Sequence, residues 1–171
     1  MGILKGIFNR TLQILVRFSP GERSLRIVLH RWRGVKIGKG CAIGTDALIE
    51  TAHPHLVSLG DRVYVGIRST IIGHFRDHPT EEEISDKTMV TVRLEDDSFV
   101  GPGCVVLPNV TIGHGAVVNA GSVVTKSVAP LTMVQGNPAE PIARCGVPLG
   151  LHTPVKEFYR QLKPIRVKKA E

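Results

Sequence analysis

Aliphatic residues recur every six positions along much of the chain, and a small residue often stands four positions after each. An early block reads Ile37, Ile43, Ile49 and then Leu59, Val65, Ile71; a later one reads Leu94, Val100, Val106, Ile112, Val118, Val124, with Ser98, Cys104, Val110, Ala116, Ser122 and Val128 in the second position. A period of six fits neither an α-helix nor an alternating strand. It is typical of a parallel β-helix, in which short strands stack into a triangular prism.

The period of six is interrupted twice. In such a prism the aliphatic side chains point inward, and coils must stack because one coil cannot bury its own apolar face. Ile49 and Leu59 are 10 residues apart, and Ile71 and Leu94 are 23 residues apart, neither a multiple of six. We therefore expect the chain to loop out at both places, the second time over residues 73–91.

Length and cysteine content favour one compact domain in a reducing compartment. A chain of 171 residues can bury roughly 70% of its unfolded surface, enough for an independent core. Cys41 and Cys104 fall on the small inward positions, Cys145 lies beyond them, and no CxxC pair occurs. An odd cysteine count and the lack of a signal-peptide pattern favour a cytoplasmic protein.

The basic charge belongs to the two ends of the chain. Residues 1–34 carry a net charge of +6, residues 35–155 carry −3 and residues 156–171 carry +4, which together give +7. This distribution does not describe a nucleic-acid groove across the body, and aromatic residues do not alternate with the basic ones. We expect no nucleic-acid partner.

Three segments follow from these patterns: a basic helical segment over residues 1–34, a β-helix over residues 35–146, and a short helix around residues 155–162 within a C-terminal segment over residues 147–171. The first helix is amphipathic, and its longest uncharged run is far too short to span a bilayer. Ser19-Pro20-Gly21 ends it, and a second basic helix is expected over residues 22–32. Two interpretations of residues 1–18 stay open: a cap on the open end of the prism, or peripheral contact with an anionic membrane.

Four motifs stand out in the later part of the chain: Asp96-Asp97-Ser98-Phe99-Val100-Gly101, Leu107-Pro108-Asn109-Val110-Thr111-Ile112-Gly113, Asn119-Ala120-Gly121-Ser122-Val123-Val124-Thr125-Lys126 and Gly136-Asn137-Pro138-Ala139. Together they resemble the hexapeptide-repeat acyltransferases, in particular the sugar O-acetyltransferases of the galactoside, maltose and nodulation type and their exopolysaccharide-modifying relatives. The resemblance covers roughly residues 35–146. It implies a left-handed β-helix, a homotrimer with clefts between subunits, and acetyl-CoA as the donor.

Acetyl transfer to a hydroxyl or amine needs a base poised near neutral pH, and histidine suits this role. His74 lies where an inward hexad passes into the long break, the place where the family resemblance puts the catalytic histidine. His78 is the alternative within the same loop. Asp77 and residues 81–83, all glutamates, are candidates to orient either imidazole, and a solvated acidic loop is the plainer explanation of the glutamates. No metal is required.

The resemblance also implies donor contacts. Ala120 matches the family's small residue beside the pantetheine arm, Thr125 and Lys126 match its Thr-Lys pair near the nucleotide phosphates, and Pro102 follows Gly101 where a relative contacts the donor. Where relatives carry Arg or Lys after Asn-Pro-Ala this chain has Glu140, and Arg144 is the nearby candidate to replace that cation. Phe99 stands where relatives often carry Trp.

The leading hypothesis is therefore an acetyl-CoA-dependent O-acetyltransferase that acts on a saccharide hydroxyl in polysaccharide or cell-envelope glycan synthesis. N-acetylation of a nucleotide-linked amino sugar is the nearest alternative. A metal enzyme like the γ-type carbonic anhydrases is less favoured, since His114 in Ile112-Gly113-His114 only superficially matches that ligand pattern. A non-catalytic trimeric scaffold is the third class.

Overall fold

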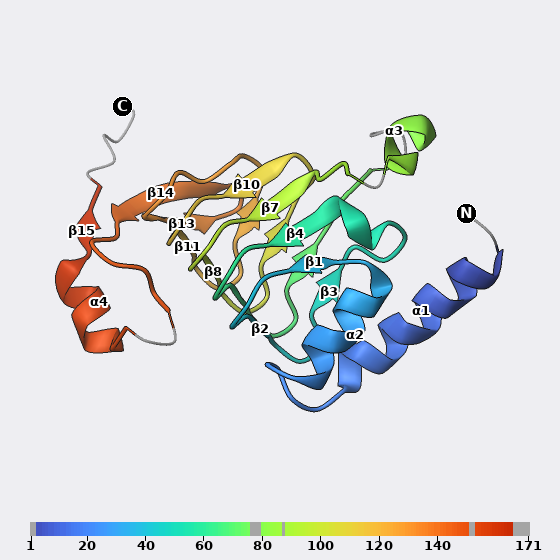
Figure 1. The fold of residues 1–171 in the computed structure, drawn as a ribbon. Helices are drawn as coiled ribbons and strands as arrows, with labels where there is room; N and C mark the ends of the chain where they lie inside the picture. Colours follow the sequence, from blue (N-terminus) through green and yellow to red (C-terminus); the bar gives the residue numbers. More distant parts are fainter. Residues whose placement is uncertain (1–2, 76–79, 87, 151–152, 166–171) are drawn as a thin grey trace.

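The computed structural model describes residues 3–75, 80–86, 88–150 and 153–165. It shows the expected left-handed parallel β-helix (Figure 1). Three sheets form the sides of the prism, and the chain visits them in the same order in every coil. We call them sheets A, B and C, and we name each corner by the two sheets that it joins.

Each sheet holds one strand from each of four coils. Sheet A contains β1 (Lys36–Ile37), β4 (Val57–Leu59), β7 (Val92–Leu94) and β10 (Val110–Ile112). Sheet B contains β2 (Ala42–Ile43), β5 (Tyr64–Val65), β8 (Phe99–Val100) and β11 (Val117–Val118), and sheet C contains β3 (Leu48–Ile49), β6 (Thr70–Ile71), β9 (Val105–Val106) and β12 (Val123–Val124). All strands of the four coils pair in parallel.

The period of six correctly predicted the core. Every aliphatic hexad position from Ile43 to Val124 is buried, and so are the six small residues that follow the later hexads. The corners are tight: a Cβ added to Gly66 would lie 2.5 Å from backbone atoms of Gly101 and Pro102 in the next coil. Only glycine allows successive coils to approach so closely at that corner.

Both interruptions of the period leave the prism at the same corner, between sheets C and A. The first contains the 3₁₀ turn η1 (Pro54–Leu56), and the second contains the short helix α3 (Glu81–Ser85). The boundaries of the second loop agree with the expected residues 73–91, since β6 ends at Ile71 and β7 begins at Val92.

The N-terminal segment covers the open end of the first coil. Helix α1 (Ile3–Phe18) packs on α2 (Leu25–Arg33), which begins three residues later than expected and ends at Gly34, a glycine with φ 108°. Arg26 donates hydrogen bonds to the carbonyl oxygens of Ile43 and Ser19, and the N–H of Ile43 donates to Glu22 at 3.0 Å. These bonds satisfy strand-edge groups that would otherwise be exposed, and the N–H of Asp46 donates to the carbonyl oxygen of Arg17 in α1 at 3.0 Å. The segment therefore caps the prism, and its contact with a membrane stays a prediction.

The opposite end departs from the six-residue period. There the chain forms an antiparallel hairpin of β13 (Thr132–Gly136) and β14 (Ala139–Arg144), and β15 (Lys163–Pro164) extends sheet B. Helix α4 (Val155–Gln161) lies where a helix was expected, and its buried Phe158 packs with Val117, Met133, Ala143 and Cys145. The C-terminal segment therefore closes the prism rather than standing apart from it.

Candidate functional site

The C–A corner brings together polar side chains from both interruptions. Glu50 directly follows β3 in the first coil, and His74 follows β6 in the second. Because β3 and β6 are paired strands with Ile49 opposite Ile71, residues that follow them lie about 4.8 Å apart along the prism. The two side chains are therefore neighbours although 23 residues of chain separate them.

Glu50 is a buried carboxylate with every oxygen engaged. Its Oε1 accepts hydrogen bonds from the N–H groups of Ala52 (2.9 Å) and His53 (3.1 Å), and its Oε2 accepts from the N–H of Gly73 (2.8 Å). Burial alone would raise the pKa of Glu50, but these hydrogen bonds and the one from His74 outweigh it and lower the pKa. The group is therefore a fixed negative charge at neutral pH.

His74 is oriented by that charge. Its Nδ1 lies 2.9 Å from Glu50 Oε2, and its side chain keeps 25% of its surface exposed. A carboxylate acceptor fixes Nδ1 as the protonated nitrogen, so Nε2 carries the free lone pair. A half-exposed imidazole with a lone pair and a buried carboxylate behind it can act as a general base.

Two further histidines of the first interruption lie beside this pair. The ring of His53 meets the ring of His74 edge-on, with 5.0 Å between centroids. Burial lowers the pKa of His53, and positive charge on His74 lowers it further. A ring nitrogen of His55 lies 2.9 Å from the carbonyl oxygen of Ile84 in α3, so the first interruption contacts the second.

Sequence reasoning did not name the acid that contacts His74. The glutamates of the long loop were the candidates, yet the described part of the loop uses Glu83 to cap α3 in a capping box with Thr80. Glu50 holds the imidazole instead, because strand pairing places the preceding coil closer than the loop. Asp77 and His78, the other sequence candidates, lie outside the described residues.

Four of the candidate donor contacts lie at two corners of one subunit. Thr125 and Lys126 follow β12 at the C–A corner, the same corner as His74 and two strands further along it. Pro102 and Ala120 lie at the B–C corner, where the carbonyl oxygen of Pro102 accepts from the N–H of Gly121 at 2.9 Å. All four are exposed.

Arg144 is in a different place. It lies at the end of β14, opposite Thr132, and its Nη1 donates to Thr132 Oγ1 at 2.7 Å. Glu140 pairs with Gln135 near the other end of the hairpin, roughly 13 Å away for four extended residues. Arg144 therefore does not stand in the position of Glu140. Phe99 stacks on Tyr64 of the neighbouring coil, with 4.7 Å between ring centroids.

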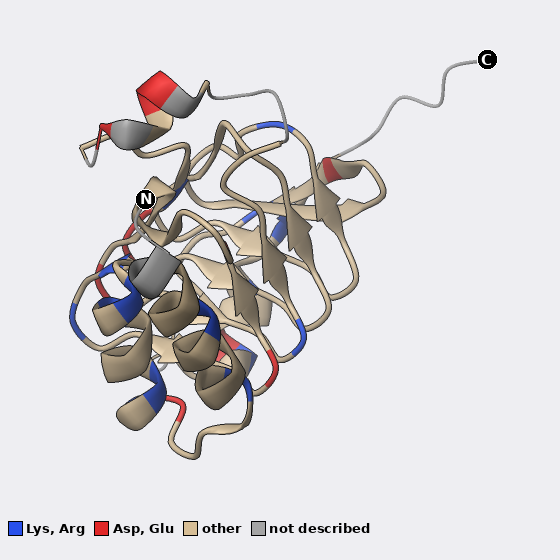
Figure 2. Cartoon of the chain, turned by 90° about the vertical axis from the view of Figure 1, so that its right-hand side faces the viewer, with Lys and Arg blue, Asp and Glu red and all other residues tan. Residues whose placement is uncertain are grey.

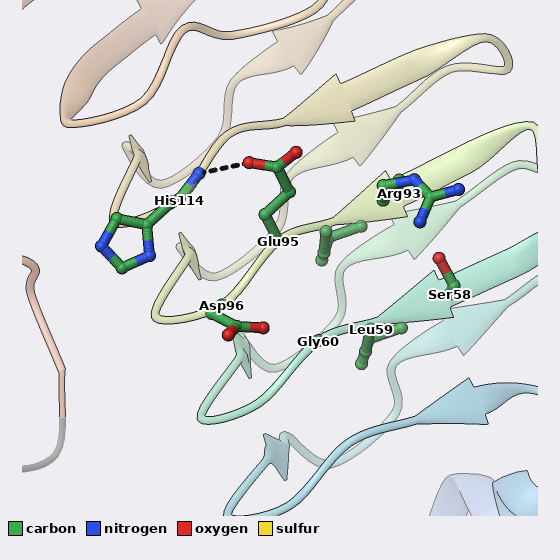
Figure 3. A pocket seen from close by; sticks show the side chains of 8 residues that line it. Ser58, Leu59, Gly60, Arg93, Glu95, Asp96 and His114 are labelled. Atoms are coloured by element: carbon green, nitrogen blue, oxygen red, sulfur yellow. Dashed lines mark hydrogen bonds between the residues drawn. The ribbon is translucent and has the colours of Figure 1, made fainter.

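A shallow pocket of about 420 Å³ opens at the A–B corner (Figure 3). Ser58, Arg93, Glu95, Asp96 and His114 line it, and the N–H of His114 donates to Glu95 Oε2 at 2.9 Å. This pocket lies at the other edge of sheet A from His74, so it is separate from the Glu50–His74 pair.

Among the described residues, no group of three or more His, Cys, Asp and Glu side chains could hold a metal ion. None of the described helices is long and apolar enough to cross a membrane.

Comparisons with known proteins agree with the fold. Residues 91–126 match the model of the family described as bacterial transferase hexapeptide (six repeats). "Putative acetyltransferase YvoF" of Bacillus subtilis is 28% identical over 135 residues, which cover 79% of this chain and 75% of that protein.

Among solved structures, a hexapeptide-repeat acetyltransferase of Vibrio cholerae superposes with a TM-score of 0.63 at 24% identity over 82% of this chain and 90% of that chain. A galactoside acetyltransferase in complex with coenzyme A gives a TM-score of 0.58 at 20% identity over 82% and 80% of the two chains. The two solved structures share the β-helix with this chain.

Proposed function

We propose that this chain transfers the acetyl group of acetyl-CoA to a hydroxyl of a saccharide, with His74 as the general base, and the match of residues 91–126 to the bacterial transferase hexapeptide family supports this proposal. The observation that carries the proposal is the Glu50–His74 pair at the C–A corner, at 2.9 Å. The name of the Bacillus subtilis relative supports acetyl transfer, and the resemblance of the motifs over residues 96–139 to sugar O-acetyltransferases supports the saccharide acceptor.

The pair performs the proton transfer that acyl transfer requires. His74 Nε2 accepts the proton of the acceptor hydroxyl as the oxygen becomes a nucleophile. The resulting imidazolium is stabilised by the ionised Glu50, which stays unprotonated because its other hydrogen bonds come from N–H groups. His74 holds the proton while the acceptor oxygen bonds to the acetyl carbon and the carbon–sulfur bond of the thioester breaks, and it then passes the proton to the departing thiolate.

The residues of the C–A corner fit acetyl-CoA, which supplies an acyl group already activated as a thioester. Lys126 offers an exposed cation for a phosphate, and Thr125 offers a hydroxyl beside it. They lie two strand spacings from His74, roughly 10 Å along the same edge. This edge would hold the donor with its phosphates near Lys126 and its acyl group toward His74.

One subunit holds only part of this donor site, which supports the proposed homotrimer. Pro102 and Ala120 lie at the B–C corner and cannot reach the C–A corner of their own subunit across sheet C. They contribute only if the B–C corner of a neighbouring copy lies against the corner of His74. In this proposal the trimer closes the cleft, and the exposed Ala120 and Pro102 face the donor from the next subunit.

The direct test is release of coenzyme A thiol from acetyl-CoA by the full chain. The acceptor panel contains free glycosides, nucleotide sugars and cell-envelope oligosaccharides, each with a matched amino-sugar partner, and product masses identify the acetylated atom. We expect acetylation of a hydroxyl acceptor. If only amino sugars are acetylated, the reaction is N-acetylation and the proposed O-acetylation is wrong. If no acceptor leads to thiol release, the whole proposal is contradicted.

A further inference from the structure

Helix α1 uses one of its faces to hold the fold together. Leu12 and Val16 pack on Leu29 of α2, and Asn9 Nδ2 donates to the carbonyl oxygen of Thr51 at 2.8 Å. With 100° of rotation per residue, these residues and the buried Gln13 occupy an arc of about 100° on the helix. This arc is the capping face.

The opposite face of α1 is apolar and points to solvent. Its large side chains are between 55% and 73% exposed: Ile7, Phe8, Ile14, Leu15 and Phe18. With Thr11 they occupy an arc of about 120°, which holds no charged residue. A helix that merely caps a domain normally presents polar residues outward, so this second apolar arc is not explained by the cap.

Helix α2 adds a second exposed apolar row. Leu25, Val28 and Trp32 recur with spacings of three and four residues, and Trp32 is 65% exposed. The two helices lie side by side at the end of the prism, as Figures 1 and 2 show. Two phenylalanines and a tryptophan are thus exposed together at one end of the molecule. Such a cluster marks an interaction surface, whereas single scattered apolar residues on a surface do not.

The charges around these rows are almost all positive. Residues 1–34 contain seven Lys or Arg and only one acid, Glu22, and Figure 2 shows basic bands on the two helices. Arg26 and Arg33 are buried, so the outward cations among the described residues of this segment are Arg10, Arg17, Arg23 and Arg31. Arg10 and the half-exposed Arg17 lie at the border of the apolar arc, where Arg17 pairs with Asp46 at 2.7 Å and its guanidinium lies 5.6 Å from the centre of the Phe18 ring. Long cationic side chains beside an apolar face suit a boundary between acyl chains and anionic headgroups.

We propose that the exposed faces of α1 and α2 bind the surface of an anionic lipid bilayer. The helices lie in the plane of the interface, the aromatic and aliphatic row enters the headgroup region, and the arginines contact lipid phosphates. The β-helix then stands on the membrane by its capped end. This inference goes beyond acetyl transfer and does not depend on it.

The experiment measures sedimentation of the full chain with vesicles of phosphatidylcholine alone or mixed with phosphatidylglycerol. We expect binding to the mixed vesicles, much weaker binding to phosphatidylcholine, and a loss of binding as salt rises from about 0.1 M to about 1 M, where the Debye length falls from about 10 Å to about 3 Å. The double variant Phe8→Ser/Phe18→Ser should lower the vesicle partition coefficient by at least about tenfold.

The matched control is Val155→Ser/Tyr159→Ser, which removes two comparably exposed apolar side chains from α4 at the other end of the molecule. This control should bind as the unaltered chain does. Absence of binding to anionic vesicles at low salt, or equal binding by the Phe8→Ser/Phe18→Ser variant, would overturn the proposal. A second copy of the chain is the alternative occupant of this face, and sedimentation velocity of the same variants tests for it. If the phenylalanine variant alone loses its oligomeric state, the face is a subunit contact and the proposal is wrong.

Discussion

At the scale of single residues, the candidate site depends on a carboxylate that is held more firmly than the imidazole it orients. Glu50 is 4% exposed and receives three backbone N–H bonds, whereas His74 has one described polar partner and a quarter of its side chain in solvent. A rigid acceptor behind a more exposed base fixes the tautomer and leaves the outer nitrogen accessible.

We therefore expect Glu50→Gln to act mainly on turnover. The amide removes the charge that stabilises the imidazolium, and it offers one acceptor oxygen in place of two, so kcat should fall by about a hundredfold. The KM for acetyl-CoA should stay within about twofold, because Glu50 lies three coils from Lys126 and touches no candidate donor contact.

Steady-state kinetics of purified enzyme check this expectation. Glu95→Gln is the matched control, since Glu95 also accepts a backbone N–H, that of His114, but at the A–B corner. If both amide variants keep similar turnover, Glu50 has no part in positioning the base.

At the scale of elements, α2 connects the cap to the site. Arg33 near its end donates to the carbonyl oxygen of Glu50 (2.7 Å), to Asn9 Oδ1 (3.0 Å), and lies 3.1 Å from His30 Nδ1. A shift of α2 would therefore move the backbone of the residue that orients His74. The N-terminal segment is thus part of the scaffold of the site as well as its end cap.

The same helix predicts how stability depends on pH. His30 is fully buried, and burial together with the charges of Arg33 and Arg26 lowers its pKa from 6.5 to about 3. Between these two pKa values the unfolded chain binds a proton at His30 that the folded chain does not. The contribution of neutral His30 to the free energy of unfolding is therefore complete above about pH 6.5 and is lost as the pH falls. The slope is about 1.4 kcal/mol per pH unit.

Replacing His30 by Gln, which keeps an acceptor for Arg33, should remove this dependence of the unfolding free energy on pH. Between pH 7.5 and pH 5 the unaltered chain should lose about 2 kcal/mol more unfolding free energy than His30→Gln, since about 1.5 pH units of the window are crossed. Urea denaturation at the two pH values measures the difference. Equal losses in both proteins would show that His30 is not held neutral in the fold.

At the scale of the whole molecule, the sequence predicted the parts of the fold that repeat. Each inward position, such as Val100 or Ile112, could be recognised because its environment is set by the same local period. The antiparallel hairpin and β15 could not be recognised in this way, because they fall outside the period and Lys163–Pro164 carries no strand pattern of its own. They form because the last coil leaves a strand edge that needs a partner.

Half of the candidate site could be predicted from the sequence. His74 came from its place before the long interruption, but Glu50 was missed because acids near His74 in sequence were preferred over acids near it in space. A signal was present: both interruptions follow the third hexad of a coil, Ile49 and Ile71, so they leave from one corner. Polar residues directly after those hexads could have been paired on that ground alone.

The division of the donor contacts between the C–A and B–C corners predicts an assembled enzyme. Sedimentation equilibrium at assay concentration should give a mass of three times 18.6 kDa, and dilution into monomers should abolish acetyl transfer, because Ala120 and Pro102 of a neighbour are then absent from the cleft. An enzyme that keeps full turnover as a monomer would show that one subunit holds a complete site.

The central claim is that His74 supplies the base for acetyl transfer, and turnover of His74→Ala tests it most directly. His114→Ala is the control, an exposed histidine at the A–B corner. With the best acceptor found, His74→Ala should lower kcat by about two to four orders of magnitude, the range of general-base catalysis, while acetyl-CoA binding and the melting temperature stay unchanged and His114→Ala stays active. A folded His74→Ala protein with turnover close to that of His114→Ala would contradict the account.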